Sequence, residues 1–398
     1  MKILQINSVC GFGSTGRIVT DIADLLMQQG HECRIAYGRG TVPDQYQSIA
    51  VRIGNDIGVK LHGLRTRLLD QHGFGSKRAT KAFLKWVDEY DPDLIHLHNI
   101  HGYYIHIGFL FEYLKKSKKP VVWTLHDCWA MTGHCAHFSA AGCEQWRDGC
   151  RKCSLLRDYP ATILGGCVKQ NYTKKKKLFT NVPKMTVVTP SYWLASIVKQ
   201  SFLGEYSVQP IYNGLDLDVF KPTKSDFREK YGLENKKIIL GVANVWGPSK
   251  GLGDFEKLSN MISDEWKIIL VGLSEQQIRS LPESIIRLPR TKNIEELVQI
   301  YTAADVYVNA SVEETMGLTT AEALACGTPV ITYNKTAVPE VADSTCGICV
   351  ETQPEEILNA LGRVHFSEEA CISRASRYEK KKQYHEYIEL YKKVFSRS

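Results

Sequence analysis

Short apolar runs alternate with segments of helical spacing along the first 200 residues. Strand-like runs lie at 2–6, 33–38, 48–53, 94–99, 121–127 and 185–191. Segments with the apolar spacing of a helix lie between several of them, at about 15–29, 79–89 and 103–117. This alternation predicts a parallel sheet with helices on both faces.

The same alternation restarts in the second half of the chain. Strand-like runs lie at 236–244, 266–272, 285–289, 305–311 and 329–334, with helical segments at about 253–262, 294–302 and 317–325. The turn-rich stretch 213–226 is the best linker candidate. We therefore expect an α/β chain of two doubly wound domains, 1–212 and 213–375.

The last thirty residues, from Glu368, are charged and periodic, which predicts a long terminal helix. We expect its final part, about 376–398, to pack back on the first domain. A ligand is expected in the cleft between the carboxyl ends of the two sheets.

Two carboxylates flank a predicted helix start. Glu314 and Glu322 stand eight positions apart, and Met316-Gly317-Leu318 lies between them. Helix N-termini carry unpaired N–H groups and a partial positive charge, which attract phosphate. Eight helical positions span about 12 Å, so one carboxylate can lie before the phosphate and the other behind it. A sugar hydroxyl on one side and a ribose on the other would suit this arrangement, as in a nucleotide-sugar.

A glycine-rich segment, GFGSTGR (11–17), follows the first strand and opens a helix. Gly11, Gly13 and Gly16 match the letters of a dinucleotide fingerprint, but the second strand ends in Gly38 and Arg39 without the acidic residue that NAD binding requires. Arg39 leaves only an NADP option. The segment is either a loop that lets a ligand approach the backbone or a tight turn.

Two further side chains are candidates for contact with a phosphorylated sugar. His126 ends the strand in TLHD and could bind a sugar hydroxyl or a phosphate oxygen, or be a satisfied core histidine. Lys250 follows the first strand of the second half, where it could reach a diphosphate or be a solvated loop residue. We interpret His96, His98 and His101 as structural, since no third metal ligand is evident.

Four of the 12 cysteines fall within nineteen residues of an insertion at about 128–160, and Cys128 is close by. Cys135, Cys143, Cys150 and Cys153 include a C-x-x-C pair, and four thiolates fit a tetrahedral structural zinc. Disulfides are disfavoured in a reducing cytosol, and reduced, unligated thiols are the alternative. The long insertion has few other means of holding a fold, which favours zinc.

Charge is distributed unevenly. Residues 1–200 carry 27 Lys and Arg against 15 Asp and Glu, a net charge of +12, and the remainder carries −5. A basic half suggests an anionic partner: nucleic acid, a membrane surface or a phosphorylated acceptor. The run Lys174–Lys177, followed by Leu178 and Phe179, is either a solvated helix face or a peripheral membrane contact. No apolar run approaches the length of a membrane span and no signal-peptide pattern is evident, so a cytoplasmic location is expected.

Several of these motifs together carry a family resemblance that extends over essentially the whole chain. The segment SVEETMGLTTAEALACGTPVI (311–331) resembles the E-x7-E region of retaining glycosyltransferases of family 4, which have the GT-B fold of two Rossmann-like domains. Lys250-Gly251 resembles the diphosphate lysine of that family, YNGLDLDVFKP (212–222) its interdomain segment, and GFGSTGR its N-terminal loop. TLHDCWAMTGHC with the cysteine cluster resembles the branch of colanic-acid, capsule and exopolysaccharide assembly enzymes.

The resemblance implies roles for the second half of the chain. Glu314 would contact the hydroxyls of the donor sugar, and Glu322 the ribose. Gly317 and Leu318, next to Met316 in the donor site, would offer backbone N–H groups to the diphosphate.

The resemblance also implies that Lys250 neutralises the leaving nucleoside diphosphate, that His126 approaches the donor sugar, and that the loop at Gly11 and Gly13 closes over the reaction centre. One departure matters. Many family members carry an arginine five positions before the lysine, where this chain has Val245.

We therefore expect a retaining, hexosyl-type glycosyltransferase that uses a UDP- or GDP-sugar and a glycan or lipid-linked oligosaccharide acceptor. No catalytic metal is expected, because no D-x-D ends a strand. A nucleotide-sugar epimerase of the same fold is the alternative enzyme. A zinc-containing protein that binds nucleic acid would explain the cysteines and the basic half but not the two carboxylates, so no nucleic-acid partner is expected.

Overall fold

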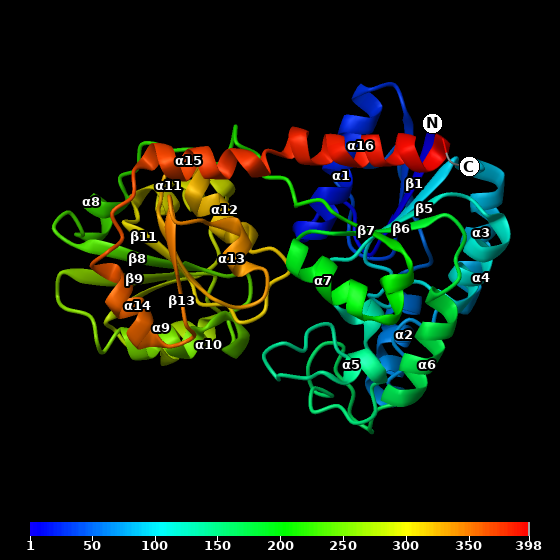
Figure 1. The fold of residues 1–398 in the computed structure, drawn as a ribbon, viewed down its shortest axis with the longest axis horizontal. Helices are drawn as coiled ribbons and strands as arrows, with labels where there is room; N and C mark the ends of the chain where they lie inside the picture. The colour runs from blue at the N-terminus through cyan, green and yellow to red at the C-terminus, as the bar shows by residue number, and fades with distance from the viewer. Residues whose placement is uncertain (397–398) are drawn as a thin grey trace. The chain divides into compact units, whose positions relative to one another are not determined.

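The computed structural model describes residues 1–396, and the chain divides into two compact units. The first unit comprises Met1–Tyr212 and the chain from Gln383 onward, and the second comprises Asn213–Lys382. Each unit is built around a parallel sheet with helices on both of its faces (Figure 1). The expected α/β architecture with two parallel sheets is confirmed.

The sheet of the first unit has seven parallel strands in the order β3-β2-β1-β4-β5-β6-β7. The strands are β1 (Lys2–Asn7), β2 (Glu32–Tyr37), β3 (Ala50–Arg52), β4 (Leu94–Leu97), β5 (Val121–Thr124), β6 (Met185–Thr189) and β7 (Ser207–Pro210). The helices are α1 (Gly13–Gln28), α2 (Asp56–Leu69), α3 (Lys77–Tyr90), α4 (Ile107–Ser117), α5 (Gln145–Asp148), α6 (Val168–Phe179), α7 (Tyr192–Gln200) and most of α16 (Lys380–Ser396).

Apolar side chains are buried on both faces of this sheet, which is why its central strands read as continuous hydrophobic runs. All residues of β4, β5 and β6 are buried. One face packs on α1 and α16, through side chains such as Ile22 and Ile388. The other packs on α4 and the end of α6, where Phe111 and Phe179 contact Trp123.

The sheet of the second unit has six parallel strands in the order β10-β9-β8-β11-β12-β13. The strands are β8 (Lys237–Val242), β9 (Trp266–Val271), β10 (Ile285–Leu288), β11 (Val306–Asn309), β12 (Val330–Tyr333) and β13 (Gly347–Val350). The helices are α8 (Phe227–Tyr231), α9 (Leu252–Leu258), α10 (Glu275–Ser280), α11 (Ile294–Ala303), α12 (Leu318–Ala325), α13 (Val338–Val341), α14 (Pro354–Leu361) and α15 (Glu368–Ala375).

The C-terminal chain differs from the single long helix expected from Glu368. It forms α15, then a 3-10 turn at Ser376–Tyr378, then α16, with Glu379 in an extended conformation between them. The break is stabilised by Leu215, whose N–H donates to the Tyr378 carbonyl at 2.6 Å and whose carbonyl accepts from the Lys380 N–H at 2.9 Å. Between α15 and α16, backbone hydrogen bonds to Leu215 therefore take the place of a turn of helix.

In each sheet, strands that are far apart in sequence meet at the centre. The order reverses between β1 and β4 in the first unit and between β8 and β11 in the second. Ligands of doubly wound sheets bind at the carboxyl ends of the strands beside such a reversal. Within residues 1–396, no helix has both the length and the hydrophobicity required to cross a bilayer.

Candidate functional site

In the second unit, Lys250 and Glu314 are brought together across the strand-order reversal. Lys250 follows β8 and Glu314 follows β11, and these two strands pair directly in the sheet. The Lys250 ammonium donates to Glu314 Oε1 and lies 3.4 Å from the Glu313 carbonyl oxygen. The side chains are 29% and 20% exposed, so the pair is accessible to a ligand from one side.

The loops that carry this pair are closely fitted. Gly251 has φ +74°, and a Cβ there would lie 2.5 Å from the Cβ of Ala310 and 2.6 Å from its carbonyl oxygen. Only glycine therefore fits at the position after Lys250. On the other loop, the Glu314 N–H donates to Thr336 Oγ1 at 3.1 Å, which fixes the backbone of the carboxylate.

Helix α12 begins just after Glu314, at the end of the loop that follows β11. Its N-cap Gly317 has φ +87° and makes no side-chain cap hydrogen bond, and its first turn holds no acidic residue. Gly317 thus offers no side chain to the first backbone N–H groups of α12, and no acid of the first turn competes for them, which favours binding of an anion at such a helix start. Met316 is different: its side chain is buried, and its sulfur accepts from the Asn213 N–H at 3.2 Å. It can therefore serve the site only through its backbone.

Glu322 lies one to two turns into α12 and is held separately from Glu314. Its Oε2 accepts a hydrogen bond from the Tyr301 hydroxyl at 2.9 Å. Beside it, the Tyr307 hydroxyl donates to Thr319 Oγ1 at 2.7 Å. Tyr301 comes from α11 and could not be assigned from the sequence, since no motif links it to Glu322.

The carboxyl edge of the first sheet carries the glycine-rich loop. Gly11 and Gly13 have φ of +77° and +67°, and a Cβ at Gly11 would lie 2.6 Å from the Pro43 ring. The loop is therefore closely packed against the segment after β2. The start of α1 resembles that of α12, since it too has neither a side-chain cap nor an acid in its first turn.

His126 is held by a chain of buried amide and imidazole groups that fixes its protonation. The Gln5 amide nitrogen donates to the Val19 carbonyl, so its oxygen accepts from His98 Nε2 at 3.1 Å. His98 Nδ1 then accepts from His126 Nε2 at 3.1 Å. Burial lowers the pKa of His126 to about 4, despite the neighbouring Asp127. Near neutral pH, His126 is thus a neutral imidazole whose lone pair is on Nδ1.

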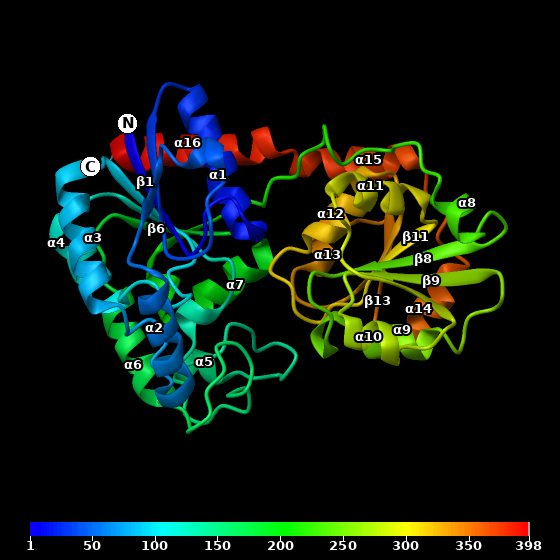
Figure 2. The same ribbon diagram turned by 180° about the vertical axis from the view of Figure 1, so that it is seen from behind.

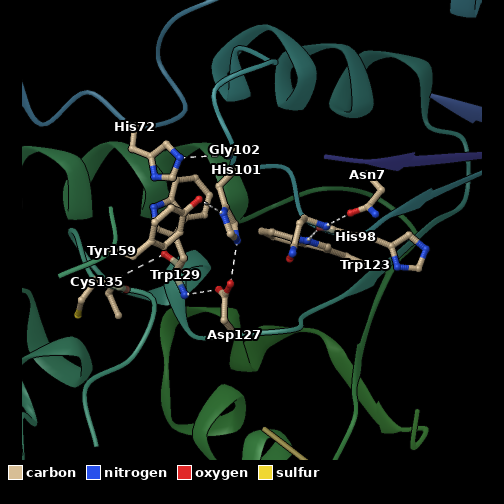
Figure 3. Close-up of polar contacts among 12 residues, drawn as sticks. Asn7, His72, His98, His101, Gly102, Trp123, Asp127, Trp129, Cys135 and Tyr159 are labelled. Carbon is tan, nitrogen blue, oxygen red and sulfur yellow. Dashed lines mark hydrogen bonds and ion pairs between the residues drawn. The ribbon is translucent and has the colours of Figure 1, made fainter. Parts of the chain in front are cut away.

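Of the three histidines interpreted as structural, His96 is fully satisfied, between Thr124 and the Tyr391 hydroxyl of α16. His101 is part of a second polar group, shown in Figure 3: its Nε2 lies 2.8 Å from Asp127 Oδ2 and its Nδ1 lies 3.1 Å from the Tyr159 hydroxyl. Burial alone would raise the pKa of Asp127, but the charge and hydrogen bond of His101 and the Trp129 N–H outweigh it and hold this pKa below its usual range.

The zinc prediction is not supported. Cys135, Cys143, Cys150 and Cys153 line one small cavity, but within residues 1–396 no three His, Cys, Asp or Glu side chains are arranged to hold a metal ion. The thiols of Cys135 and Cys153 hydrogen-bond to each other, and Cys150 accepts from the Gly133 N–H at 3.2 Å.

The insertion has a core that its sequence did not indicate. The ring of Trp146 is buried and stacks on Phe138, with ring centroids 5.1 Å apart. A buried hydrogen bond of 2.6 Å joins His134 Nδ1 to Asp70 Oδ1 at the end of α2. Aromatic packing and this buried contact therefore give the insertion a core of its own.

The lysine run 174–177, interpreted as either a solvated helix face or a peripheral membrane contact, has three exposed lysines and one buried one. Lys175 is buried, with its ammonium 3.5 Å from the centroid of the Trp129 ring, and Phe179 is fully buried against Trp123. Burial lowers the pKa of Lys175 to about 7, and the Trp129 and Thr132 carbonyls accept its hydrogen bonds. The run therefore cannot present Phe179 to lipid.

The two doubly wound parallel sheets have the GT-B fold, and the comparisons with known proteins define the class, a glycosyltransferase. Family models match the chain over two separate stretches: "Glycosyltransferase Family 4" over residues 15–163 and "Glycosyl transferases group 1" over residues 236–365. The chain belongs to family 4 of the glycosyltransferases, a retaining family.

Similar proteins span the chain to different extents. A putative colanic acid biosynthesis glycosyl transferase, WcaC of Escherichia coli K12, is 24% identical over 99% of this chain and 100% of its own length. The D-inositol 3-phosphate glycosyltransferase of Mycobacteroides abscessus is 29% identical, over 42% of this chain and 41% of its own.

Two solved structures are similar in fold over the full length. Sucrose-phosphate synthase from Thermosynechococcus elongatus has a TM-score of 0.74 at 18% identity, covering 100% of both chains. Anabaena Alr3699/HepE in complex with UDP has a TM-score of 0.68 at 17% identity, covering 99% of this chain and 100% of that one.

Proposed function

We propose that the protein transfers a sugar from a UDP- or GDP-sugar to a hydroxyl of a lipid-linked glycan during assembly of a surface polysaccharide. One observation carries the donor half of the proposal: the Lys250–Glu314 pair stands directly before the start of α12, whose N-cap is a glycine and whose first turn holds no acid. A cation, a carboxylate and free helix N–H groups are what a sugar diphosphate needs.

The pair suggests an exchange of partners on donor binding. Before binding, Lys250 and Glu314 neutralise each other. The diphosphate would replace Glu314 as the partner of Lys250, and the released carboxylate would accept hydrogen bonds from the sugar hydroxyls. Val245 is 73% exposed and offers no charge, so Lys250 and the α12 N–H groups would bear the diphosphate without the second cation found in many relatives.

The chemical step follows from where charge develops. As the glycosidic bond breaks, the sugar ring becomes oxocarbenium-like and the diphosphate gains negative charge. Donors that are already oriented toward that charge lower the barrier. Glu322, oriented by Tyr301, is proposed to bind the ribose. The neutral His126 is proposed to assist transfer by accepting a hydrogen bond at Nδ1, and the loop at Gly11 and Gly13 to cover the reacting groups.

The acceptor half of the proposal rests on the similarity of the chain to a relative. The name of the full-length relative from Escherichia coli refers to colanic acid biosynthesis, and a lipid-linked glycan intermediate is the acceptor class that fits such a pathway. A cytoplasmic location, with reversible attachment to the membrane that carries the acceptor, is part of this proposal.

A two-stage experiment tests it. Thermal stabilisation by UDP-, GDP- and ADP-sugars first identifies the donor, since a ligand raises apparent stability by mass action. The best donor is then incubated with and without lipid-linked glycans extracted from membranes. We expect sugar on the lipid fraction only when both substrates are present. Conversion of the donor without an acceptor would instead identify an epimerase.

A further inference from the structure

Helix α2 differs from an ordinary surface helix: several of its large apolar side chains face outward, and the buried residues on its inner side are polar. Ile57, Leu61 and Leu64 are 70%, 62% and 54% exposed. On the inner side, His62 and Thr66 are buried, and each makes a hydrogen bond within the unit. The buried side is thus satisfied by polar contacts, and the leucine side has no partner in the described part of the chain.

The outward side chains form one narrow stripe with positive charge on both sides. At about 100° per residue, Ile57, Leu61, Leu64 and Leu68 fall within about 60° of one another around the helix axis. Lys60 and Arg67 lie on one flank of the stripe and Arg65 on the other, and all three are exposed. The only acid of the helix is Asp56, which is paired with Arg52. An apolar stripe between basic flanks is the pattern of a helix that lies in a membrane interface.

A neighbouring loop extends the apolar surface. Ile163 and Leu164 are 67% and 70% exposed. The loop is attached to the last turn of α2, where the Ile163 N–H and the Thr162 hydroxyl both donate to the Arg67 carbonyl, at 2.8 and 3.1 Å. Figure 2 shows α2 on the outside of the first unit. The stripe and this loop are called the α2 surface below.

A basic cavity borders the flank of the stripe that carries Arg65. A cavity of about 710 Å³ between α2 and the start of α3 is lined by Leu61, Arg65, Lys77 and Arg78, among others. Both basic residues from α3 stand in its first turn, which contains no acid. The cavity therefore offers positive charge next to the exposed leucines.

We propose that the α2 surface docks the protein on an anionic lipid bilayer, with α2 lying in the interface and its leucines among the acyl chains. Charge complementarity selects this partner: basic residues flank the stripe on both sides, and the half of the chain that carries it has a net charge of +12. A protein groove would recognise the apolar stripe but has no need of cations on both flanks. A bilayer uses both, through apolar burial and attraction to anionic headgroups.

The docking proposal rests on the membrane attachment in the proposed function, but it is tested separately from sugar transfer. Binding to vesicles is measured without a donor or an acceptor, so its failure would leave sugar transfer untouched. The reverse also holds, because a protein that binds vesicles through α2 could still fail to transfer sugar to a lipid-linked glycan.

The test is co-flotation of the full chain with vesicles of phosphatidylglycerol and phosphatidylcholine, compared with vesicles of phosphatidylcholine alone. The variant Leu61→Glu/Leu64→Glu places charge in the stripe and is expected to lower the partition coefficient by about tenfold or more. Both side chains are already exposed, so its circular dichroism and melting temperature should match those of the wild type. Met27→Glu on α1, at an exposed position of 38%, is the matched control and should bind like the wild type.

A second variant separates this surface from the lysine run. Lys60→Gln/Arg67→Gln should weaken binding to anionic vesicles and reduce its salt dependence, whereas Lys174→Gln/Lys176→Gln should have the smaller effect. Three results would overturn the proposal: no flotation of the wild type with anionic vesicles, equal flotation of the leucine variant, or a wild-type dimer in analytical ultracentrifugation that the leucine variant converts to a monomer. The last result would assign the α2 surface to a second copy of the chain.

Discussion

Replacement of Lys250 by alanine tests the proposed donor site most sharply, because the residue can be removed with little effect on folding. Its ammonium is paired with Glu314 at the surface end of a loop, and both side chains are partly exposed. Ion pairs of this kind contribute about 0–1 kcal/mol to stability. The variant should therefore melt within about 2–4 °C of the wild type, as expected for a unit of this size.

The effect on turnover should be much larger than the effect on stability. Lys250 is the basic side chain that pairs with Glu314, directly before the start of α12. Removal of one preoriented donor from a developing anion lowers kcat by about 100- to 1,000-fold, or about 2.7–4 kcal/mol. Position 245 is a valine, so no arginine there can compensate for the loss of the Lys250 ammonium.

The assay is steady-state transfer with the donor that most stabilises the wild type. Lys257→Ala, an exposed lysine on the following helix α9, is the matched control and should keep wild-type kinetics. A loss of less than about tenfold for Lys250→Ala, with the fold intact, would refute the assignment of Lys250 to the diphosphate.

Four further outcomes are expected. Gly251→Ala should lose about 1–3 kcal/mol of stability because of its clash and positive φ, while Gly253→Ala, with open space around it, should be neutral or stabilising in thermal melts. Tyr301→Phe should raise the donor KM about two- to tenfold by removing a hydrogen bond to Glu322; an unchanged KM would contradict the ribose role. Burial lowers the pKa of His62 to about 4, so on acidification the unfolded state binds a proton before the folded state does. The free energy of unfolding should therefore fall as the pH falls from about 6.5 to 4, by up to about 1.4 kcal/mol per pH unit for this residue. A free energy of unfolding that stays constant over this pH range would contradict this. Chelators should leave the melting temperature unchanged, since aromatic packing holds the cysteine insertion; a large drop would restore the zinc prediction.

Periodicity predicted the architecture because strands buried on both faces leave continuous apolar runs. The long central strands, such as β1 and β8, could therefore be recognised from the sequence, and the two-sheet fold is confirmed. Short edge strands such as β7 and β13 have too few apolar residues to be recognised. The break before α16 depends on backbone hydrogen bonds to Leu215, a partner more than 160 residues away in sequence, and no local pattern encodes it.

The site was predictable in its parts but not in its contacts. Glu314 and Lys250 each carry a local signal, but their pairing depends on the adjacency of β8 and β11. The cysteine spacing favoured zinc because the aromatic core around Trp146 has no sequence signature of its own. Helix α2 was hard to recognise for a related reason: its leucines face solvent and its inner residues are polar, so the usual rule of apolar burial does not describe it.

The central claim is glycosyl transfer from a nucleotide-sugar with retention of configuration, and proton NMR of the product tests it most directly. The donor identified by thermal stabilisation is incubated with a lipid-linked glycan, and the anomeric coupling of the transferred sugar is compared with that in the donor. We predict that sugar reaches the acceptor with the donor's anomeric configuration, and that the donor alone is unchanged apart from slow hydrolysis. An inverted product, or a donor isomerised without any acceptor, would contradict the account.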